Sequence, residues 1–366
     1  MNIKSLRGAL CAALAVLAAP AFAHGDDVKV VVTPLQPEVA YSRAATATRP
    51  AVSTFLAYAV TVTNLDDDTL KNVVFRGTTS VTEPTEKATF VSAQGASCVA
   101  AADGITVECS LGALTRGQSF PTFTLFFAAP VRSTVLPAGN PADCVTTDCV
   151  GFAGKVSYTE DRWSYRSPSY ELQAWSAAPV ALAVASSDKV RSAVPPGGLT
   201  LATGDAGFST ATDRFTTEIV VPPSYVPPAG SFATAAIDEA VDPVGCSALA
   251  TCYRSTITVP GTFSPYLTVI LRVDAADIPK GRKIGSVLIS YEGLIIGDCA
   301  SPTTPRTDGI PCIAKRVAYP KSSKSKDDDK DDRYKSSTPS TPVPPDLAGD
   351  FEWTILNLNN GSYKIF

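Results

Sequence analysis

The sequence predicts an all-β protein made of two tandem β-sandwich domains that follow a signal peptide. Thr, Val, Ser and Ala are abundant, and 29 Pro and 24 Gly occur among the 366 residues. This composition favours strands and turns over sustained helices. Short segments of alternating apolar and polar residues recur along the chain, and their spacing is typical of a β-sandwich.

The clearest strand is Thr54–Asn64, in which Leu56, Tyr58, Val60 and Val62 share one face. A period of two is the pattern of a half-buried strand. Other strands of the first half are expected at Val28–Thr33, Asn72–Arg76, Ile105–Cys109, Phe120–Phe127 and Lys155–Thr159. In the second half they are expected at Phe215–Val221, Phe232–Ile237, Ser255–Val259, Leu267–Val273 and Ile284–Tyr291.

The first residues have the layout of a secretory signal peptide. Lys4 and Arg7 precede an apolar run that ends at Leu17, and Ala21-Phe22-Ala23 has the form of a cleavage site. The run is too short to span a bilayer, and no later stretch is long and apolar enough to do so. We therefore expect residues 1–23 to be removed and the protein to be exported without membrane insertion. The expected destination is the periplasm, the cell surface or the medium.

A turn-rich passage, Val194-Pro195-Pro196-Gly197-Gly198, follows the polar run Ser186–Lys189 and suggests a domain boundary. The predicted domains are 24–188 and 189–366. The second contains a charged, Pro-rich segment, 321–348, which we expect to be disordered because it has few apolar side chains to bury.

Beyond that segment, Phe351–Leu358 and Tyr363–Phe366 are strand-like, and Asn359–Ser362 resembles a hairpin turn. We expect these strands to complete the sheet of their own domain. The alternative is that they pair with a neighbouring copy and build a strand-exchanged filament.

Apart from Cys11, the eight cysteines form four close pairs, and an even number of cysteines in an exported chain indicates disulfides. The predicted bridges are Cys98–Cys109, Cys144–Cys149, Cys246–Cys252 and Cys299–Cys312. Metal binding is the competing interpretation. It is disfavoured because no pair has the C-x-x-C spacing and histidines to complete a site are lacking. No metal or other cofactor is expected.

One stretch of the first domain resembles a bacterial family known as domain of unknown function 11. The resemblance starts at Tyr58-Ala59-Val60-Thr61-Val62-Thr63-Asn64 and Thr69–Val74. It continues through Phe90–Ala93, Cys98, Val107–Leu114 and Gly117, and covers roughly Val28–Ala185. Such domains are immunoglobulin-like modules of secreted and surface proteins. The resemblance therefore implies immunoglobulin-like sandwiches with roles in surface architecture, adhesion or envelope structure, and it implies no catalytic residues.

Catalytic constellations are scarce in the sequence. The one histidine, His24, would be the first residue of the mature chain, which disfavours Ser-His-Asp and Cys-His sites. An N-terminal histidine invites a copper hypothesis, but no second histidine exists to complete such a site. Glu160 and Asp161 would point to opposite faces of a strand, so they would not flank one glycosidic bond together. We expect no enzymatic activity.

Four aromatic residues offer an alternative function as a platform for sugar rings: Trp163, Tyr165, Tyr170 and Trp175. Such residues also commonly pack a sandwich core, and both interpretations stay open at this point. The net charge of −4 and the lack of a basic run do not favour nucleic-acid binding. The preferred interpretation is a non-catalytic envelope or surface protein. The sequence does not identify its partner; the candidates are other envelope proteins, a copy of itself and a glycan.

Overall fold

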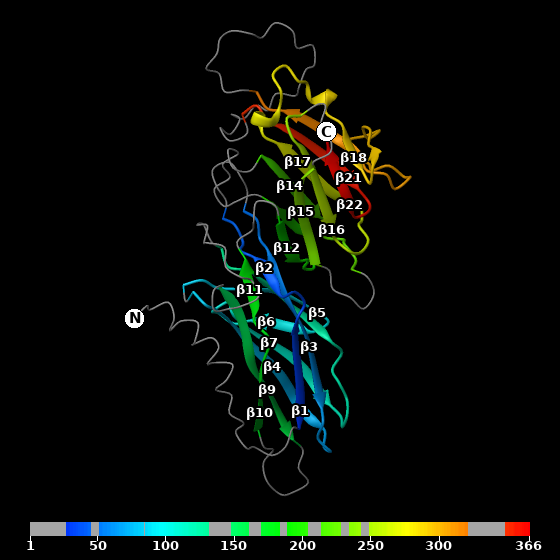
Figure 1. The fold of residues 1–366 in the computed structure, drawn as a ribbon. Helices are drawn as coiled ribbons and strands as arrows, with labels where there is room; N and C mark the ends of the chain where they lie inside the picture. The colour runs from blue at the N-terminus through cyan, green and yellow to red at the C-terminus, as the bar shows by residue number, and fades with distance from the viewer. Residues whose placement is uncertain are drawn as a thin grey trace, which may run out of the picture. The chain divides into compact units, whose positions relative to one another are not determined.

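The computed structural model describes residues 27–44, 51–83, 85–131, 148–160, 170–183, 189–203, 214–227, 234–242, 249–320 and 348–366. These residues form strands and two short 3₁₀ helices, with no α-helix among them, which confirms the all-β class. The chain divides into two compact units (Figure 1). One comprises Met1–Ser42, Ser53–Arg132 and Leu136–Val184, and the other comprises Arg43–Val52, Ser133–Val135 and Ala185–Phe366.

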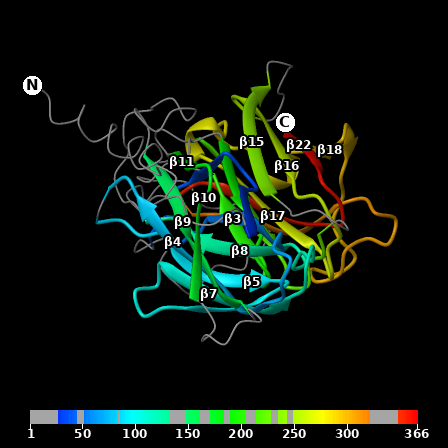
Figure 2. The same cartoon turned by 90° about the horizontal axis from the view of Figure 1, so that it is seen from below.

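The first unit contains two sheets, and strands of both are labelled in Figure 2. The four-stranded sheet has the order β1 (Val28–Pro34), β3 (Phe55–Asn64), β8 (Phe123–Ala128) and β5 (Thr89–Gln94). The seven-stranded sheet runs in the order β2 (Glu38–Ala40), β11 (Val180–Ala183), β9 (Cys149–Glu160), β4 (Leu70–Val81), β7 (Thr106–Leu114) and β6 (Ser97–Ala100). Its remaining strand, β10 (Tyr170–Ser176), also pairs with β9.

The core of the first unit lies between these two sheets. The face of β3 predicted from the sequence, Leu56, Tyr58, Val60 and Val62, is fully buried. Its residues join Phe75 and other apolar side chains of the seven-stranded sheet in one cluster. The sandwich is thus held by burial of apolar surface, worth about 25 cal/mol per Å².

Two glycines lie opposite each other where β4 and β9 pair, Gly77 and Gly154. A Cβ at position 154 would overlap the carbonyl oxygen of Arg76, and a Cβ at position 77 would overlap the ring of Phe152. Glycine is required at both positions because another backbone or an aromatic ring occupies the space of a side chain.

The second unit also contains two sheets. The six-stranded sheet has the order β12 (Lys189–Ala193), β15 (Thr234–Asp242), β16 (Cys252–Thr258), β22 (Gly361–Ile365), β18 (Ile289–Tyr291) and β19 (Leu294–Ile295). The five-stranded sheet has the order β13 (Leu199–Ala202), β14 (Phe215–Val221), β17 (Leu267–Val273), β21 (Phe351–Asn357) and β20 (Cys312–Ala318). Phe215 of one sheet stacks on Tyr253 of the other with ring centroids 4.9 Å apart. The two sheets therefore pack face to face.

Strands β21 and β22, red in Figure 1, pair within the second unit as expected. The hairpin predicted at Asn359–Ser362 is wrong, however, because β21 and β22 belong to different sheets. The turn carries the chain from one sheet to the other. Trp353 of β21 and Tyr363 of β22 both point into the core, so the two strands face each other through side chains rather than backbone hydrogen bonds.

Two other strand predictions need correction. Ile284–Tyr291 is not one strand, because η2 (Ile284–Ser286) precedes β18. The hydroxyl of Ser286 donates to the carbonyl of Lys283 and supports the tight turn. The strand expected from Phe120 begins at Phe123, and Pro121 has no backbone N–H to offer a sheet. The other short helix, η1, is Ala275–Asp277.

Candidate functional site

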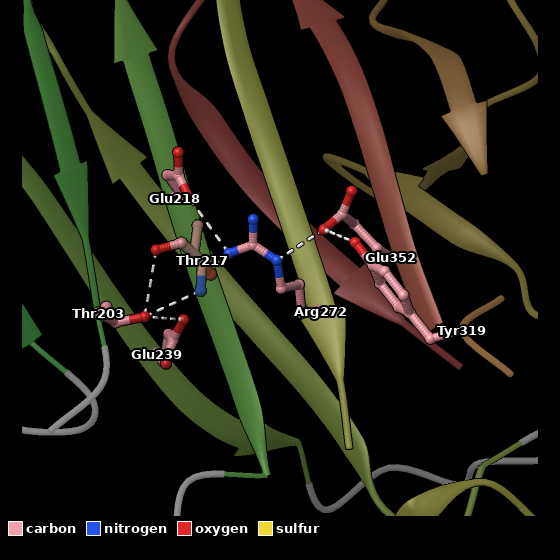
Figure 3. A network of polar contacts seen from close by, with 7 residues as sticks. All are labelled: Thr203, Thr217, Glu218, Glu239, Arg272, Tyr319 and Glu352. Carbon is pink, nitrogen blue, oxygen red and sulfur yellow. Dashed lines mark hydrogen bonds and ion pairs between the residues drawn. The ribbon is translucent and has the colours of Figure 1, made fainter. Parts of the chain in front are cut away.

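A largely buried charged cluster lies on the five-stranded sheet of the second unit. We call it the Arg272 cluster; it consists of Glu218, Arg272, Tyr319 and Glu352 (Figure 3). The guanidinium of Arg272 donates to Glu218 at 3.1 Å and to Glu352 at 2.7 Å. The Tyr319 hydroxyl donates to the same Glu352 oxygen at 3.1 Å. One cation thus joins strands β14, β17 and β21.

Strand periodicity explains why these side chains meet. On β17, Leu271 and Val273 point into the core, so Arg272 between them points to the opposite face. The antiparallel register places Arg272 directly opposite Glu352. Glu218 lies diagonally across on β14, within reach of a long side chain.

Burial makes the Arg272 cluster electrostatically strong. The side chains of Arg272, Glu218 and Glu352 are only 19%, 17% and 11% exposed. Burial alone would lower the pKa of Arg272. The charges of Glu218 and Glu352, with their hydrogen bonds, outweigh that effect and raise the pKa above its ordinary value. The guanidinium therefore stays charged.

Tyr319 is affected by the same surroundings. Burial, the nearby charge of Glu352 and the hydrogen bond to it raise the pKa of Tyr319 to about 12. The tyrosine is therefore neutral at physiological pH and acts as a hydrogen-bond donor to the carboxylate.

A second polar group, the inter-sheet cluster, lies inside the same unit and consists of Thr203, Thr217, Glu239 and Ser255. The Thr203 hydroxyl lies 2.7 Å from the Glu239 carboxylate and accepts the backbone N–H of Thr217 at 2.9 Å (Figure 3). The Thr217 hydroxyl donates to Ser255 at 2.8 Å. Thr217 belongs to one sheet and Ser255 to the other, so the cluster joins the two layers across their apolar interior.

A third contact fixes the 3₁₀ helix η1. The carboxylate of Asp277 is almost fully buried; it pairs with Arg214 at 3.1 Å and accepts the Tyr253 hydroxyl. Burial and this carboxylate raise the pKa of Tyr253 above its ordinary range. The buried carboxylate thus has both a counter-charge and a hydroxyl donor, the arrangement that a buried charge requires.

These clusters supply charge compensation and hydrogen bonds between strands. Across the described ranges, no group of three or more His, Cys, Asp or Glu residues is placed to hold a metal ion. The hydroxyls of Thr203, Thr217 and Ser255 bond to one another, to backbone or to Glu239. The arrangement is chemically suited to holding strands and sheets in register.

The aromatic platform considered from the sequence is only partly described. Trp163 and Tyr165 lie outside the described residues, and Tyr170 begins β10, where its backbone pairs with Thr159. Trp175 is 8% exposed and stacks on Phe75 with a centroid distance of 4.7 Å. Its ring faces are therefore occupied by the core, and Trp175 is not available for stacking on a sugar.

Two predicted cysteine pairs are disulfide-bonded in the structure. Cys98–Cys109 joins the edge strand β6 to β7, and Cys299–Cys312 joins the loop after β19 to β20. Cys149 and Cys252 are also disulfide-bonded. Their predicted partners, Cys144 and Cys246, lie outside the described residues. All six described cysteines are thus oxidised.

The Arg272 cluster was not predicted from the sequence. Arg272 is the one charged residue of the segment Leu267–Val273, and a charge in such a strand indicates a partner nearby. Identifying that partner requires the strand order, which places β21, some eighty residues later in the chain, beside β17.

Comparison with known proteins assigns no family. No family model matches the sequence, and no curated protein matches it. Among solved structures, an inactive mutant of GH20 exo-β-N-acetylglucosaminidase from Vibrio harveyi is similar over 47% of this chain, with 11% identity and a TM-score of 0.21. The match covers 20% of that enzyme chain, so the overlap carries no argument about fold or activity. Within the described residues, no helix is long and apolar enough to cross a membrane.

Proposed function

We propose that this chain is an exported bacterial envelope or cell-surface protein with a structural or adhesive role and no catalytic one. The observation that carries the proposal is that all six described cysteines are disulfide-bonded. Disulfides persist in the periplasm and outside the cell, whereas the cytosol keeps thiols reduced. The resemblance to surface modules and the signal-peptide pattern support the same location.

The placement of the disulfides supports a structural role. Strand β6 has only four residues and lies at the edge of its sheet, where Cys98–Cys109 holds it to β7. Cys299–Cys312 fixes a loop to β20, the edge strand of the second unit's five-stranded sheet. Edge strands are where sheets separate or pair with other chains. Bridges at these positions suit a protein that must keep its shape outside the cell.

The polar clusters suit the same role. Arg272 connects three neighbouring strands of one sheet, and Thr217 with Ser255 connects the two sheets of that unit. Neither cluster contains a histidine, because His24 is the one histidine of the chain. The side chains of both clusters thus hold strands and sheets of the second unit together.

Location is tested by fractionating native cells and labelling thiols before and after reduction. We expect the protein in the periplasm, the outer membrane or the medium, with its cysteines labelled only after reduction. Recovery in the cytosol with freely reactive thiols would contradict the proposal.

A structural role is distinguished from a catalytic one by how the phenotype depends on the amount of protein. A deletion strain is complemented from a titratable promoter, and surface attachment and envelope permeability are measured. A structural or adhesive protein should restore the phenotype in proportion to its amount. Full restoration by trace expression would instead indicate turnover and would contradict the non-catalytic assignment.

A further inference from the structure

Strands β21 and β22 occupy interior positions in both sheets of the second unit. β21 lies between β17 and β20, and β22 lies between β16 and β18. Without these two strands, each sheet would be divided into two separate parts. One short segment therefore completes both layers of the sandwich.

The connection that precedes β21 is much longer than the geometry requires. Ala318 of β20 and Phe351 of β21 are direct register partners, and the N–H of Tyr319 donates to the carbonyl of Asp350 at 2.9 Å. A turn of about two residues closes antiparallel strands at such a point. The chain instead places residues 320–349 there.

Strands β21 and β22 are held in the second unit by their own buried side chains and backbone pairing. Trp353 and Ile355 of β21 are fully buried, as is Ile365 of β22, and Tyr363 is nearly so. β21 pairs with β17 along its whole length, from Phe351 opposite Val273 to Asn357 opposite Leu267. β22 pairs with β16 and β18. None of these contacts depends on the covalent connection to β20.

We propose that residues 348–366 form an exchangeable two-strand element that completes the second unit of either its own chain or a second copy of this chain. The contacts in the two arrangements are the same, and the choice between them depends on concentration. This inference is independent of the proposed location and role.

The length of the connection sets the expected concentration scale. A random coil of thirty residues would have a root-mean-square span of roughly 30 Å, and a tether of that span gives an effective concentration on the order of 1 mM. Its own segment should therefore fill the unit in dilute solution. A second copy should compete when the protein is refolded at about 1 mM or held at similar density on a surface.

The test compares the full chain with a variant in which residues 320–349 are replaced by Asn-Gly. Both proteins are unfolded in urea with disulfides intact, refolded from dilute to about 1 mM protein, and separated by size. We expect dimers of the full chain that increase with concentration and persist on rapid dilution. We expect only monomers of the short-turn variant. Absence of dimers of the full chain, or equal dimerisation of both, would overturn the proposal.

A second measurement identifies how such a dimer is held. A site for a sequence-specific protease is inserted between Lys335 and Ser336 of the full chain, and the dimer is cut after it forms. In a strand-exchanged dimer this connection is the bond between the two bodies, so cutting should release monomer-sized complexes that keep the cleaved segment bound. A dimer that survives complete cutting would be held by other contacts and would overturn the proposal.

Discussion

Two buried tyrosines offer a direct test of how unpaired polar groups affect this fold. Tyr58 is fully buried between the sheets of the first unit, and its hydroxyl has no hydrogen-bond partner among the residues that the structure describes. Its ring packs against Phe152 at 4.7 Å and Phe127 at 6.0 Å. Burial raises the pKa of Tyr58 above its ordinary range. The ring stabilises the core, whereas the hydroxyl is buried without a partner from the described part of the chain.

The change Tyr58→Phe removes that hydroxyl and keeps the ring. An unsatisfied buried hydroxyl costs about 1–3 kcal/mol. Removing it also leaves a small void, which offsets part of the gain. We therefore expect the free energy of unfolding of the first unit to rise by about 1 kcal/mol.

The matched control is Tyr363→Phe. Tyr363 is also buried, but its hydroxyl accepts a hydrogen bond from the side-chain amide of Asn357. Loss of that acceptor leaves a buried amide N–H with one partner fewer, so the free energy of unfolding of the second unit should fall by about 1–3 kcal/mol. The two substitutions are chemically identical and should have opposite signs.

The assay is urea unfolding followed by tryptophan fluorescence and circular dichroism, with a separate transition fitted for each unit. The expected result is a higher midpoint for Tyr58→Phe and a lower one for Tyr363→Phe, with unchanged slopes. Destabilisation of the first unit by about 1 kcal/mol or more in Tyr58→Phe would refute the reasoning, since it would reveal a buried partner for the hydroxyl.

Three further predictions concern other contacts. Gly154→Ala should destabilise the first unit by about 3 kcal/mol because the added Cβ overlaps backbone. The control Gly297→Ala, with open space around the added Cβ, should leave urea midpoints unchanged. Equal effects of the two substitutions would contradict the argument from close approach. Arg272→Met should lower the free energy of unfolding of the second unit by about 3 kcal/mol, measured in urea, because two partly buried carboxylates lose their cation. An unchanged free energy of unfolding would show that the carboxylates are solvated. The pKa of Tyr319 is raised from 10.0 to about 12, so its contribution is complete below pH 10 and is lost as pH rises toward 12. Tyr319→Phe should therefore lose less stability than wild type across that pH interval, and identical pH profiles would exclude the contribution.

Individual strands were well predicted where one face is buried and the other exposed. Phe215–Val221 and Leu267–Val273 are strands with the predicted limits, because their inward residues alternate without interruption. The sequence was less informative at Ile284–Tyr291, where Gly285 and Ser286 favour a local turn. Short strands such as β2 and β19 have too few residues to show a period.

The local sequence pattern does not determine which distant strands pair with each other. Asn359–Ser362 has the composition of a hairpin turn, but whether the flanking strands pair with each other depends on strands far away in the chain. The Arg272 cluster needs the same information. Trp175 illustrates a related difficulty, since its inward position depends on the space that Gly77 leaves on β4, which is separated from β10 by β9. The resemblance of the first domain to immunoglobulin-like surface modules stays a prediction.

The inter-sheet cluster of the second unit has a consequence for conformational uniqueness. Apolar layers attract each other without directional preference, so burial alone tolerates small lateral displacements of one layer over the other. Hydrogen bonds of 2.7 Å from Thr203 to Glu239 and 2.8 Å from Thr217 to Ser255 do not tolerate them. A layer shifted by a single residue would leave these groups dehydrated and unpaired, which makes every such alternative packing costly. The polar groups thereby select one alignment of the two sheets from the several that would bury the apolar surfaces equally well.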